Sequence, residues 1–401
     1  MTVRQNKRRV FVTGVGVVSP LGPGRHETEK ALLAGKDAVS EVTLFDVSKT
    51  RCKTAGQVDD AWLSEAVPRS RQSRRLHRSA RMVALALREA VSQAGSVAPE
   101  RFVVATSAGG MSNGEAYYRG VLRSASRRRF AEYVANYTPQ KPVLDALEVA
   151  GLRLPAQVLT NACSSGANAI GHAFELVRGG VHDCVLCGGY DPLAELVFVG
   201  FDSLQASTPE KIRPFDRGRS GLVLGEGAAV LVLEHESGVL AKGKEPLAEL
   251  VGYGAATDTF HLTQPHPSGV GTRLAMERAL ATAGVEPAKV DYVNCHGTAT
   301  LFNDATEGAA ISALFPHRVA ASSTKSMMGH ALGGAGAIEA AVCVLALRRQ
   351  FLPPNLNFRE PDPGWTFEIV ANKARMATLE YALSNSIGFG GVNATLLFRR
   401  A

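Results

Sequence analysis

Apolar runs that lead into glycine-rich turns recur along the first part of the chain. Residues 9–17 (RVFVTGVGV) are the clearest example and predict a strand. Similar runs predict strands at residues 101–106, 182–188 and 223–233. Apolar positions at helical spacing predict helices at residues 26–35 and 78–94 and within 112–150, whereas residues 36–70 show little periodicity. Strands alternating with helices in this way predict an α/β fold.

The second part of the chain repeats the order of elements found in the first. Residues 247–255 (LAELVGYGA) resemble the opening strand, and 166–170 (GANAI) match 334–338 (GAGAI) at the start of two apolar helices. Residues 103–106 likewise parallel 292–295, and Gly188-Gly189 parallels Gly390-Gly391. This shared order predicts an internal duplication, with halves at residues 1–245 and 246–401 that bury their central helices between two sheets.

Cys163 lies in a loop of small residues at the start of the first central helix. A helix N-terminus offers unpaired N–H groups and partial positive charge, and both stabilise a thiolate. In a duplicated fold, the chemistry is expected where the helix starts of the two halves meet. Considered alone, Cys163 could equally be a buried structural cysteine, which is the commoner fate of a single cysteine.

Two histidines occupy loops of the second half. His296 follows an apolar strand in residues 293–300 (VNCHGTAT), where open α/β sheets place their sites. His330 precedes the second central helix, and the matched segments make it the counterpart of Ala162, which predicts that it lies near Cys163. One cysteine and two histidines suggest nucleophilic catalysis with strong hydrogen-bond donors. Buried, satisfied histidines are the alternative, and a zinc site is another, although the close ligand spacing of such sites is absent.

Composition narrows the class of protein. The chain has 401 residues, is 45% hydrophobic and contains 40 glycines, which suits a packed α/β enzyme and not a disordered chain. No apolar run reaches membrane-spanning length and no signal-peptide core follows Met1, so we expect a cytoplasmic protein. The six cysteines form no disulfide framework, and the CxxC at 184–187 is predicted to be part of a buried strand. The glycines of 13–16 (TGVG) lack the remainder of a dinucleotide-binding fingerprint.

The net charge of +7 comes largely from two arginine clusters. They are Arg69, Arg71, Arg74, Arg75, Arg78 and Arg81, and Arg119, Arg123, Arg127, Arg128 and Arg129. Nucleic acid is one conceivable partner, but the motifs of nucleic-acid-binding proteins are absent, so we predict no nucleic-acid partner. An acidic protein partner fits the charge equally well, and for each single arginine a solvated helix face is the simpler interpretation.

Six motifs along nearly the whole chain carry a resemblance to a known family. They are VTGVGVVSPLG at 12–22, NACSSG at 161–166, RPFDRGRSGLVLGEGAAVLVLE at 213–234, CHGTAT at 295–300, STKSMMGHALGGAGAIEA at 323–340 and NSIGFGGVNA at 385–394. In these motifs the chain resembles the elongating β-ketoacyl-[acyl-carrier-protein] synthases, which are condensing enzymes of fatty-acid and polyketide synthesis. The resemblance implies the duplicated thiolase fold, with five αβαβα layers and two mixed sheets around central helices, and a homodimer that needs no metal or redox cofactor.

The resemblance also implies roles for individual residues. Cys163 would accept an acyl group from acyl carrier protein. His296 and His330 would bind the thioester carbonyl of malonyl-carrier and stabilise the enolate that forms as CO₂ leaves. Lys325 would hydrogen-bond within this site, and Glu339 would order Lys325.

Further roles concern the entrance to the site. Phe389 would be a gate, and its backbone N–H would form an oxyanion hole with that of Cys163. Thr298, Thr300 and Gly390 would bind the pantetheine arm of the carrier. The acidic residues that would structure the neighbouring loop are Asp304 and Glu307. Carrier docking would fall to basic residues near the entrance, namely Arg74, Arg75, Arg127, Arg128 and Lys211 or Arg213.

Departures from the family pattern bear on substrate choice. Leu301 and Phe302 replace the usual residues after the second threonine, and Ile387 replaces an aromatic residue before the gate. These departures support a second interpretation. In it, the chain is a ketosynthase dedicated to a polyene or polyketide secondary metabolite and forms a heterodimer with a chain-length partner. Three other kinds of protein with this fold fit the sequence less well. A thiolase would need a second cysteine near the C-terminus, and initiating and plant-type synthases use Cys-His-Asn. A chain-length factor lacks the nucleophile.

Overall fold

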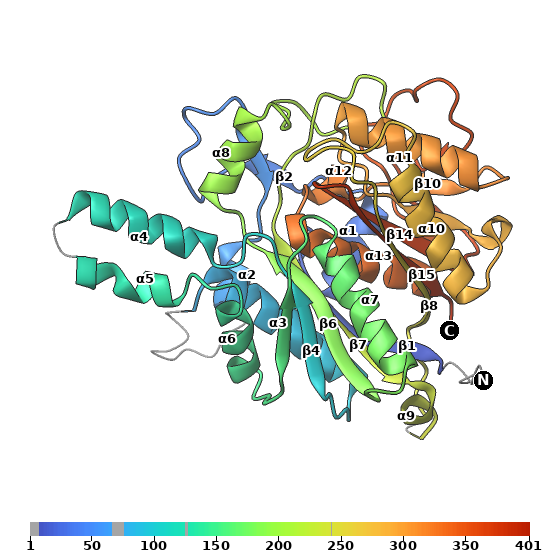
Figure 1. The fold of residues 1–401 in the computed structure, drawn as a ribbon, viewed down its shortest axis with the longest axis horizontal. Coiled ribbons are helices and arrows are strands. Elements are labelled where there is room, and N and C mark those ends of the chain that lie inside the picture. The colour runs from blue at the N-terminus through green and yellow to red at the C-terminus, as the bar shows by residue number, and fades with distance from the viewer. Residues whose placement is uncertain (1–7, 66–75, 125–126, 242) are drawn as a thin grey trace.

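The computed structural model describes residues 8–65, 76–124, 127–241 and 243–401, with only the backbone described at Glu65, Arg127 and Arg129. Two sets of five strands share one topology in it (Figure 1). The first set is β1 (Val10–Val18), β4 (Arg101–Ala105), β5 (Ala156–Leu159), β6 (Cys184–Asp191) and β7 (Gly227–His235). The second set is β8 (Ala248–Thr257), β9 (Tyr292–Asn294), β10 (Ala320–Ser322), β14 (Tyr381–Gly388) and β15 (Val392–Arg399).

Each set has its strands in the same spatial order. Numbered within its set, that order is third, second, fourth, fifth, first, as β5-β4-β6-β7-β1 and β10-β9-β14-β15-β8. In both sets the second strand pairs in parallel with the third and fourth, and the remaining pairs are antiparallel. The predicted duplication is therefore present in the topology.

The two five-stranded units meet at one edge. Strands β1 and β8 pair antiparallel over three residues, with Val10 opposite Leu250 and Val12 opposite Ala248. Hydrogen bonding thus continues from one unit into the other, and with β12 (Glu368–Ile369) beside β10 it forms a continuous eleven-stranded sheet. The two predicted sheets are joined because their first strands share this short ladder.

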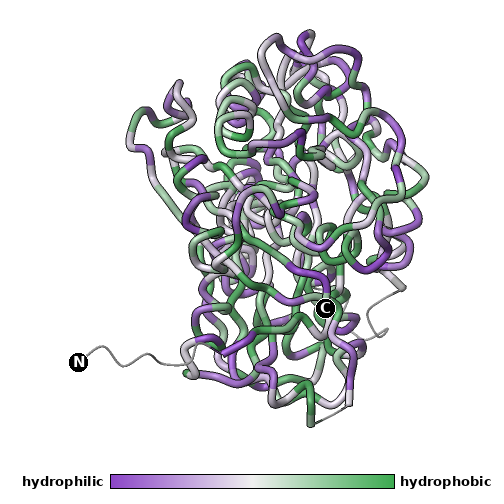
Figure 2. The backbone as a smooth tube through the Cα atoms, turned by 90° about the vertical axis from the view of Figure 1, so that its right-hand side faces the viewer, coloured by the Kyte–Doolittle hydropathy of each residue, from purple (hydrophilic) through white to green (hydrophobic). Residues whose placement is uncertain are grey.

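Helices complete a layered arrangement. The central helices α7 (Ser165–Arg178) and α13 (Ala335–Arg349) contact each other and strands of both units, while α3 (Arg78–Ala94) and α10 (Val270–Ala283) cover the outer faces (Figure 1). Residues 335–347 of α13 are all buried, as expected for a helix with sheets on both sides. Hydrophobic stretches run through the interior and hydrophilic stretches gather in outer loops (Figure 2).

The remaining elements are shorter or lie at the periphery. They are α1 (Arg25–Ala34), β2 (Val39–Glu41), β3 (Thr54–Gly56), α2 (Asp60–Glu65), α4 (Met111–Arg123), η2 (Arg127–Phe130), α5 (Ala131–Ala135), α6 (Lys141–Val149), α8 (Glu195–Ser203), α9 (Glu236–Ala241), η3 (Pro287–Lys289), α11 (Leu301–Leu314), α12 (Lys325–Met328), η4 (Leu332–Gly334), β11 (Phe351–Leu352) and β13 (Arg375–Met376). Helices α4 and α5 project from the body as a hairpin (Figure 1).

Two glycines on the first strand of each unit allow an outer helix to approach closely. A Cβ at Gly14 or Gly16 would lie 2.1 or 1.9 Å from a carbonyl oxygen of α3. A Cβ at Gly252 or Gly254 would lie 2.2 Å from a carbonyl oxygen of α10 in each case. The glycines of 13–16 therefore serve helix packing, in agreement with the rejection of a nucleotide-binding role.

The sequence match between the central helices was wrong by two residues. A Cβ on Gly166 would lie 2.7 Å from the nitrogen of Ala337, and one on Gly336 would lie 2.7 Å from the nitrogen of Ala167. This reciprocal contact pairs Gly166 with Gly336 and not with Gly334. Small residues recur so often in both segments that the sequence could not distinguish the two registers.

Backbone conformation supports the same correction. Ala162 and Leu332 each precede a central helix by three residues and both have positive φ, 56° and 48°. Leu332, and not His330, is therefore the counterpart of Ala162. The match of Gly188-Gly189 with Gly390-Gly391 was also wrong, because the first pair lies inside β6 and the second lies in the turn after β14.

Two segments differ from their prediction. Residues 36–70 were expected to be irregular, but their described part contains β2, β3 and α2. The strand predicted from residue 223 begins only at Gly227. Its expected first residues bond instead to the segment around His330, where Gly225 N donates to the His330 carbonyl at 2.9 Å.

The glycine contacts predict a stability difference. We expect Gly16→Ala and Gly254→Ala each to lower the free energy of unfolding by about 1–3 kcal/mol, since an added methyl group has no room against the helix. Denaturant unfolding measures this effect. The matched control is Gly200→Ala on α8, where a Cβ meets nothing within 4 Å, so we expect about 0.5–1 kcal/mol of stabilisation there. Equal stabilities of all three variants would contradict the close approach.

Candidate active site

Cys163 lies on a tight turn that leads into α7. Ala162 has positive φ, and its carbonyl accepts hydrogen bonds from Ser165 N at 3.1 Å and from Ser107 Oγ at 3.1 Å. The Asn161 N–H donates to Ser165 Oγ at 2.8 Å. These bonds hold the loop in a conformation that non-glycine residues seldom adopt, and Cys163 itself is only 8% exposed.

His296 follows β9 in a loop whose backbone is held by a buried carboxylate. The N–H groups of His296 and Gly297 each donate to Glu307 at 2.8 Å, and Asn385 donates to the same carboxylate at 3.2 Å. Glu307 lies on α11 and is fully buried. The predicted structuring role of Glu307 therefore has a direct geometric basis.

The His330 backbone is bound to the segment before β7. Its N–H donates to the Val223 carbonyl at 2.8 Å, and its carbonyl accepts from Gly225 N. The side chain is 1% exposed, and neither ring nitrogen has a partner among the described residues. The rings of His296 and His330 lie 5.1 Å apart between centroids, at 85° to each other. Buried polar atoms without partners are costly, so both ring nitrogens of His330 are available to hydrogen-bond a molecule in the cavity.

A buried ion pair stands behind the two histidines. Lys325 Nζ pairs with Glu339 Oε1, and each side chain is 1% exposed. Lys325 Nζ also lies 3.4 Å from His296 Nδ1. Because an ammonium can only donate, this contact favours the His296 tautomer with its proton on Nε2.

These groups meet at one cavity of about 260 Å³. Cys163, His296 and His330 line it together with predicted arm-binding and gate residues, namely Thr298, Thr300, Phe389 and Gly390, and with Leu301, Phe302 and Ile387. The hydroxyls of Thr298 and Thr300 are 2.9 Å apart. Residues scattered over more than 200 positions of sequence are thus brought into one pocket.

Phe389 occupies the turn between β14 and β15. Its ring stacks on Phe201 of α8, with centroids 5.6 Å apart, and is 38% exposed. Its backbone N–H acts on the Cys163 sulfur and lowers the pKa of that thiol. Gly390 and Gly391 follow it with φ of 83° and 75°, a conformation that favours glycine. The turn therefore places both an aromatic ring and an N–H donor beside the cysteine.

The protonation state of the cysteine differs from the expectation. Burial raises the pKa of the Cys163 thiol to about 12, although the Lys325 charge and the Phe389 N–H act in the opposite direction. With its pKa raised to about 12 the group is a thiol at neutral pH, because desolvation outweighs the opposing effects of Lys325 and the Phe389 N–H. Burial also lowers the pKa of His296 and His330 well below the usual histidine value, with Lys325 adding to the effect, so both rings are neutral.

Three buried carboxylates surround the cavity. Burial raises the pKa of Glu307 and Glu339 to about 7, and that of Asp191 to about 6. Asp191 was not recognised from the sequence. It accepts from Ala108 N at 2.7 Å and from Gly333 N at 2.6 Å, and so joins the β4 loop to the start of α13. Its only sequence signal is an acidic residue at the end of an apolar strand.

A second unrecognised contact joins the two halves beside Cys163. The hydroxyl of Tyr253 on β8 donates to Asn168 Oδ1 on α7 at 2.6 Å. Asn168 in turn lies 3.4 Å from the Ser164 hydroxyl. In the sequence, the only sign of this contact is that Asn168 is a polar residue within an apolar helix. Its partner Tyr253 lies 85 positions away, so the sequence does not reveal it.

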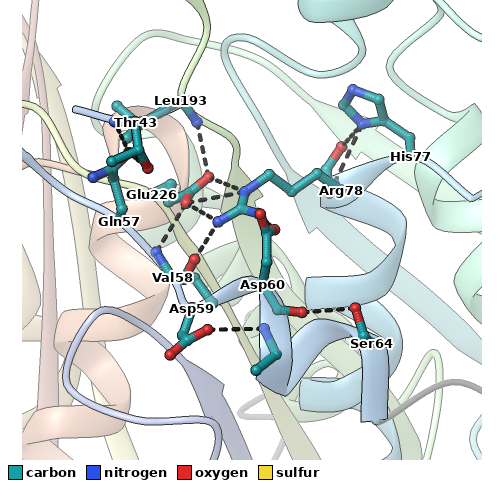
Figure 3. Close-up of polar contacts among 12 residues, drawn as sticks. Thr43, Gln57, Val58, Asp59, Asp60, Ser64, His77, Arg78, Leu193 and Glu226 are labelled. Atoms are coloured by element: carbon teal, nitrogen blue, oxygen red, sulfur yellow. Dashed lines mark hydrogen bonds and ion pairs between the residues drawn. The ribbon is translucent and has the colours of Figure 1, made fainter. Parts of the chain in front are cut away.

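Arg78 belongs to the first arginine cluster but is not a solvated surface residue. Its side chain is 16% exposed and pairs with Glu226, which also accepts from Val58 N at 2.9 Å and Leu193 N at 3.1 Å (Figure 3). Glu226 is completely buried. The pair therefore joins the start of α3 to the segment that precedes α8.

The predicted docking residues have different surroundings. Arg74 and Arg75 lie outside the described residues, and only the backbone of Arg127 is described. Arg128 is exposed and lies in η2, between α4 and α5. Arg213 pairs with Glu210 and its side chain is 12% exposed, while Lys211 pairs with Asp37.

The described part of the chain contains neither a metal-binding cluster nor a membrane-spanning helix. No group of three or more His, Cys, Asp or Glu side chains in that part of the chain is placed to hold a metal ion. None of the helices within the described ranges is both long and apolar enough to cross a membrane. All six cysteines are free thiols.

A cysteine and two neutral histidines lie where the two duplicated halves meet, and the relatives and the family model identify the chain as a condensing enzyme of the acyltransferase type. The chain matches the family "Beta-ketoacyl synthase, N-terminal domain" over residues 7–238 and "Beta-ketoacyl synthase, C-terminal domain" over residues 247–359. It therefore belongs to the β-ketoacyl synthase family.

Individual relatives agree over the full length. The chain is 35% identical to 3-oxoacyl-[acyl-carrier-protein] synthase 2 of Synechocystis sp., over 98% of each chain. Among solved structures, it resembles "the ishigamide ketosynthase/chain length factor" with a TM-score of 0.93 and 31% identity, over 98% of this chain and 100% of that one. It also resembles a type II polyketide ketosynthase in complex with its acyl-carrier protein, with a TM-score of 0.88 and 26% identity, over 98% of this chain and 100% of that one. The predicted thiolase fold is confirmed.

The buried thiol predicts an unusual pH dependence of alkylation. We expect the rate of Cys163 modification by iodoacetamide to rise about tenfold per pH unit from pH 7 to pH 10, because the thiolate fraction grows throughout a range below a pKa near 12. Mass spectrometry locates the modified cysteine, and Cys163→Ala provides the blank. A plateau by pH 8 would show instead that the helix start and Lys325 overcome burial.

Proposed function

We propose that the protein catalyses the decarboxylative Claisen condensation of an acyl group with malonyl-acyl carrier protein in fatty-acid-type chain elongation. One observation carries the proposal: the two unpartnered nitrogens of His330 and the His296 ring line the same cavity as Cys163. Such donors suit a negative charge that develops on a thioester oxygen. The family membership supports the same reaction.

In the first step, Cys163 Sγ attacks the thioester carbonyl of acyl-carrier. Charge on the carbonyl oxygen is stabilised by the N–H groups of Cys163 and Phe389. Collapse of this intermediate releases the carrier thiol, which leaves with the proton that the cysteine thiol supplied. Since burial keeps Cys163 protonated at rest, proton loss accompanies attack and does not precede it.

In the second step, malonyl-carrier binds with its thioester carbonyl oxygen toward His296 and His330. Loss of CO₂ leaves an enolate, whose oxygen accepts hydrogen bonds from the His296 Nε2–H and a ring N–H of His330. The enolate carbon then attacks the acyl group on Cys163 and forms β-ketoacyl-carrier, while the Cys163 thiolate that leaves takes up a proton from solvent. Neutral rings suit this step, because they donate hydrogen bonds without a permanent charge that would trap the enolate.

Supporting residues position these groups. Lys325 orients His296 through Nδ1, and Glu339 balances the buried ammonium. We assign Thr298, Thr300 and Gly390 to the pantetheine arm because they line the same cavity. Asp304 holds the threonine loop by accepting from Ala299 N, between the two threonines, at 3.1 Å, and it also accepts from Phe215 N at 2.7 Å.

Assembly and location complete the proposal. We assign carrier docking in part to the exposed Arg128 and to Arg74, Arg75 and Arg127, and expect a homodimer. We place the division between halves at residue 245, since the strand order starts again at β8. A cytoplasmic location is supported by six free cysteines, as expected in a reducing compartment.

A dedicated secondary-metabolite ketosynthase is the second candidate. Leu301, Phe302 and Ile387 line the cavity in place of the family's usual residues. The similar ishigamide structure is described as a ketosynthase with a chain length factor. Light scattering of the purified protein, alone and with a candidate partner, and condensation with a panel of acyl-carriers would separate the two functions.

The nucleophile predicts two contrasting variants. We expect Cys163→Ala to abolish condensation with no change in thermal stability, because only the acyl acceptor is lost. Cys163→Gln should retain or raise malonyl-carrier decarboxylation, since a neutral amide resembles the acylated cysteine while both histidines remain. Product analysis with radiolabelled malonyl-carrier checks both outcomes. Condensation by the alanine variant above a trace would refute the role of Cys163.

The histidines predict a separation of the two steps. We expect His296→Ala and His330→Ala each to lower decarboxylation by about 10²–10³-fold, because each removes one donor to the enolate oxygen. Acylation of Cys163 should fall much less, since neither ring is required to stabilise that oxyanion. Single-turnover acylation with labelled acyl-carrier measures this difference. Equal loss of both steps in both variants would indicate a Cys–His pair in place of the proposed mechanism.

A further inference from the structure

The carbonyl oxygen of Ala162, just before the cysteine, accepts three hydrogen bonds. Ser165 donates two of them, from its backbone N–H at 3.1 Å and from Oγ at 2.5 Å. The third comes from Ser107 Oγ at 3.1 Å, and Ser107 lies 55 positions away in the loop that follows β4. The first two bonds tie the carbonyl to its own helix turn, whereas the third ties it to the sheet of the first unit.

This carbonyl belongs to the same peptide group as the Cys163 N–H. Because the peptide group is planar and trans, its C=O and N–H bonds point in opposite directions and turn together. A hydrogen bond that fixes the Ala162 oxygen therefore fixes the direction of the Cys163 N–H. Hydrogen bonds to the oxygen also polarise the peptide group and strengthen its N–H as a donor. That N–H is one of the two donors assigned above to the oxyanion of the acylation step.

Ser107 is held in turn by a buried carboxylate. Its backbone N–H donates to both oxygens of Asp191, at 3.0 and 2.9 Å, and Asp191 is completely buried. The same carboxylate accepts from Ala108 N at 2.7 Å and from Gly109 N at 3.2 Å. Asp191 is the last residue of β6, which pairs with β4. Two neighbouring strands therefore hold the Ser107 hydroxyl in place.

The backbone conformations that these bonds maintain are unfavourable ones. Ala162 has a φ of 56° and Leu332 a φ of 48°, which residues other than glycine seldom adopt. Gly333, which follows Leu332, donates its N–H to Asp191 at 2.6 Å. Asp191 thus acts directly on the turn before α13 and, through Ser107, on the turn before α7. Strained conformations persist only where the surrounding contacts determine them, and they concentrate at active sites.

We propose that Ser107 and Asp191 are positioning residues that aim the Cys163 N–H at the oxyanion formed when an acyl group is transferred to the cysteine. The proposal rests on the condensation function above and adds two residues to its first step. Decarboxylation of malonyl-carrier places its negative charge at His296 and His330, so that reaction does not depend on the Ser107 hydroxyl.

The test separates acyl transfer from the reactivity of the sulfur. We expect Ser107→Ala to slow single-turnover acylation of Cys163 by labelled acyl-carrier about three- to tenfold, as the loss of one hydrogen bond predicts. Alkylation of Cys163 by iodoacetamide should stay within about 1.5-fold of wild type, because displacement of iodide forms no oxyanion. Decarboxylation of malonyl-carrier should likewise change less than about twofold. Ser107→Thr keeps the hydroxyl and should restore acylation to within about twofold of wild type.

A second variant tests the link through the carboxylate. We expect Asp191→Asn to slow acylation about tenfold or more, because an amide cannot accept from all of these N–H groups. Adding Ser107→Ala to it should lower the rate by less than about twofold, since both changes release the same carbonyl. The control is Ser64→Ala on α2, another exposed serine whose Oγ donates to a backbone carbonyl, that of Asp60 at 2.8 Å. It should change neither acylation nor alkylation.

Three outcomes overturn the proposal. Acylation of Ser107→Ala at the wild-type rate would show that the hydroxyl positions nothing. Equal losses of acylation and alkylation would show a general change of the turn and not the loss of an aimed donor. If wild type accepts no acyl group from the carrier while iodoacetamide still modifies Cys163, the proposed function fails and this proposal fails with it. The Ser107 variants decide between these outcomes even if thermal unfolding shows that Asp191→Asn does not fold.

Discussion

The arrangement of the active-site loops depends on the close approach of the N-terminal ends of α7 and α13. Gly166 and Gly336 face each other so tightly that a Cβ on either would lie 2.7 Å from a backbone nitrogen of the other helix. This contact brings the turn at Cys163 against the segment of His330 and fixes the distance between the two halves. A larger residue at either position would clash with the facing backbone, and the clash would not be relieved easily because sheets pack on both sides of the two helices.

Buried carboxylates keep the loops around this contact in place. Asp191 and Glu307 each bind several backbone N–H groups, across positions that no regular element connects. Their burial is unfavourable for charge, as the raised pKa values show, and the hydrogen bonds offset much of that cost. The same dry surroundings keep both histidines neutral and Cys163 protonated. The site thereby holds a neutral thiol and two neutral imidazole rings, and not a thiolate–imidazolium ion pair.

The ion pair of Lys325 and Glu339 is a further case in which a buried charge is compensated. A lone ammonium beside two histidines would be expensive to bury, and the adjacent carboxylate compensates it. The glutamate lies on α13 and the lysine on the short helix before it, so the ion pair also joins the second helix start to the histidine loops. Arg78 and Glu226 form a comparable buried pair behind the segment that leads to α8 (Figure 3).

The sequence alone determined the α/β class, the long elements such as 78–94, the duplication and the clustering of Cys163, His296 and His330, while the family resemblance of its motifs added Lys325. These follow from hydrophobic periodicity and local motifs, which depend on neighbours in the chain. Tertiary structure decided the register of the central helices, because repeated small residues fit two alignments and only packing excludes one. It also decided the partners of Asp191 and Tyr253 and the burial of Arg78. Above all, it decided that Cys163 is a thiol, since desolvation depends on what surrounds the sulfur in space and leaves no mark in the sequence.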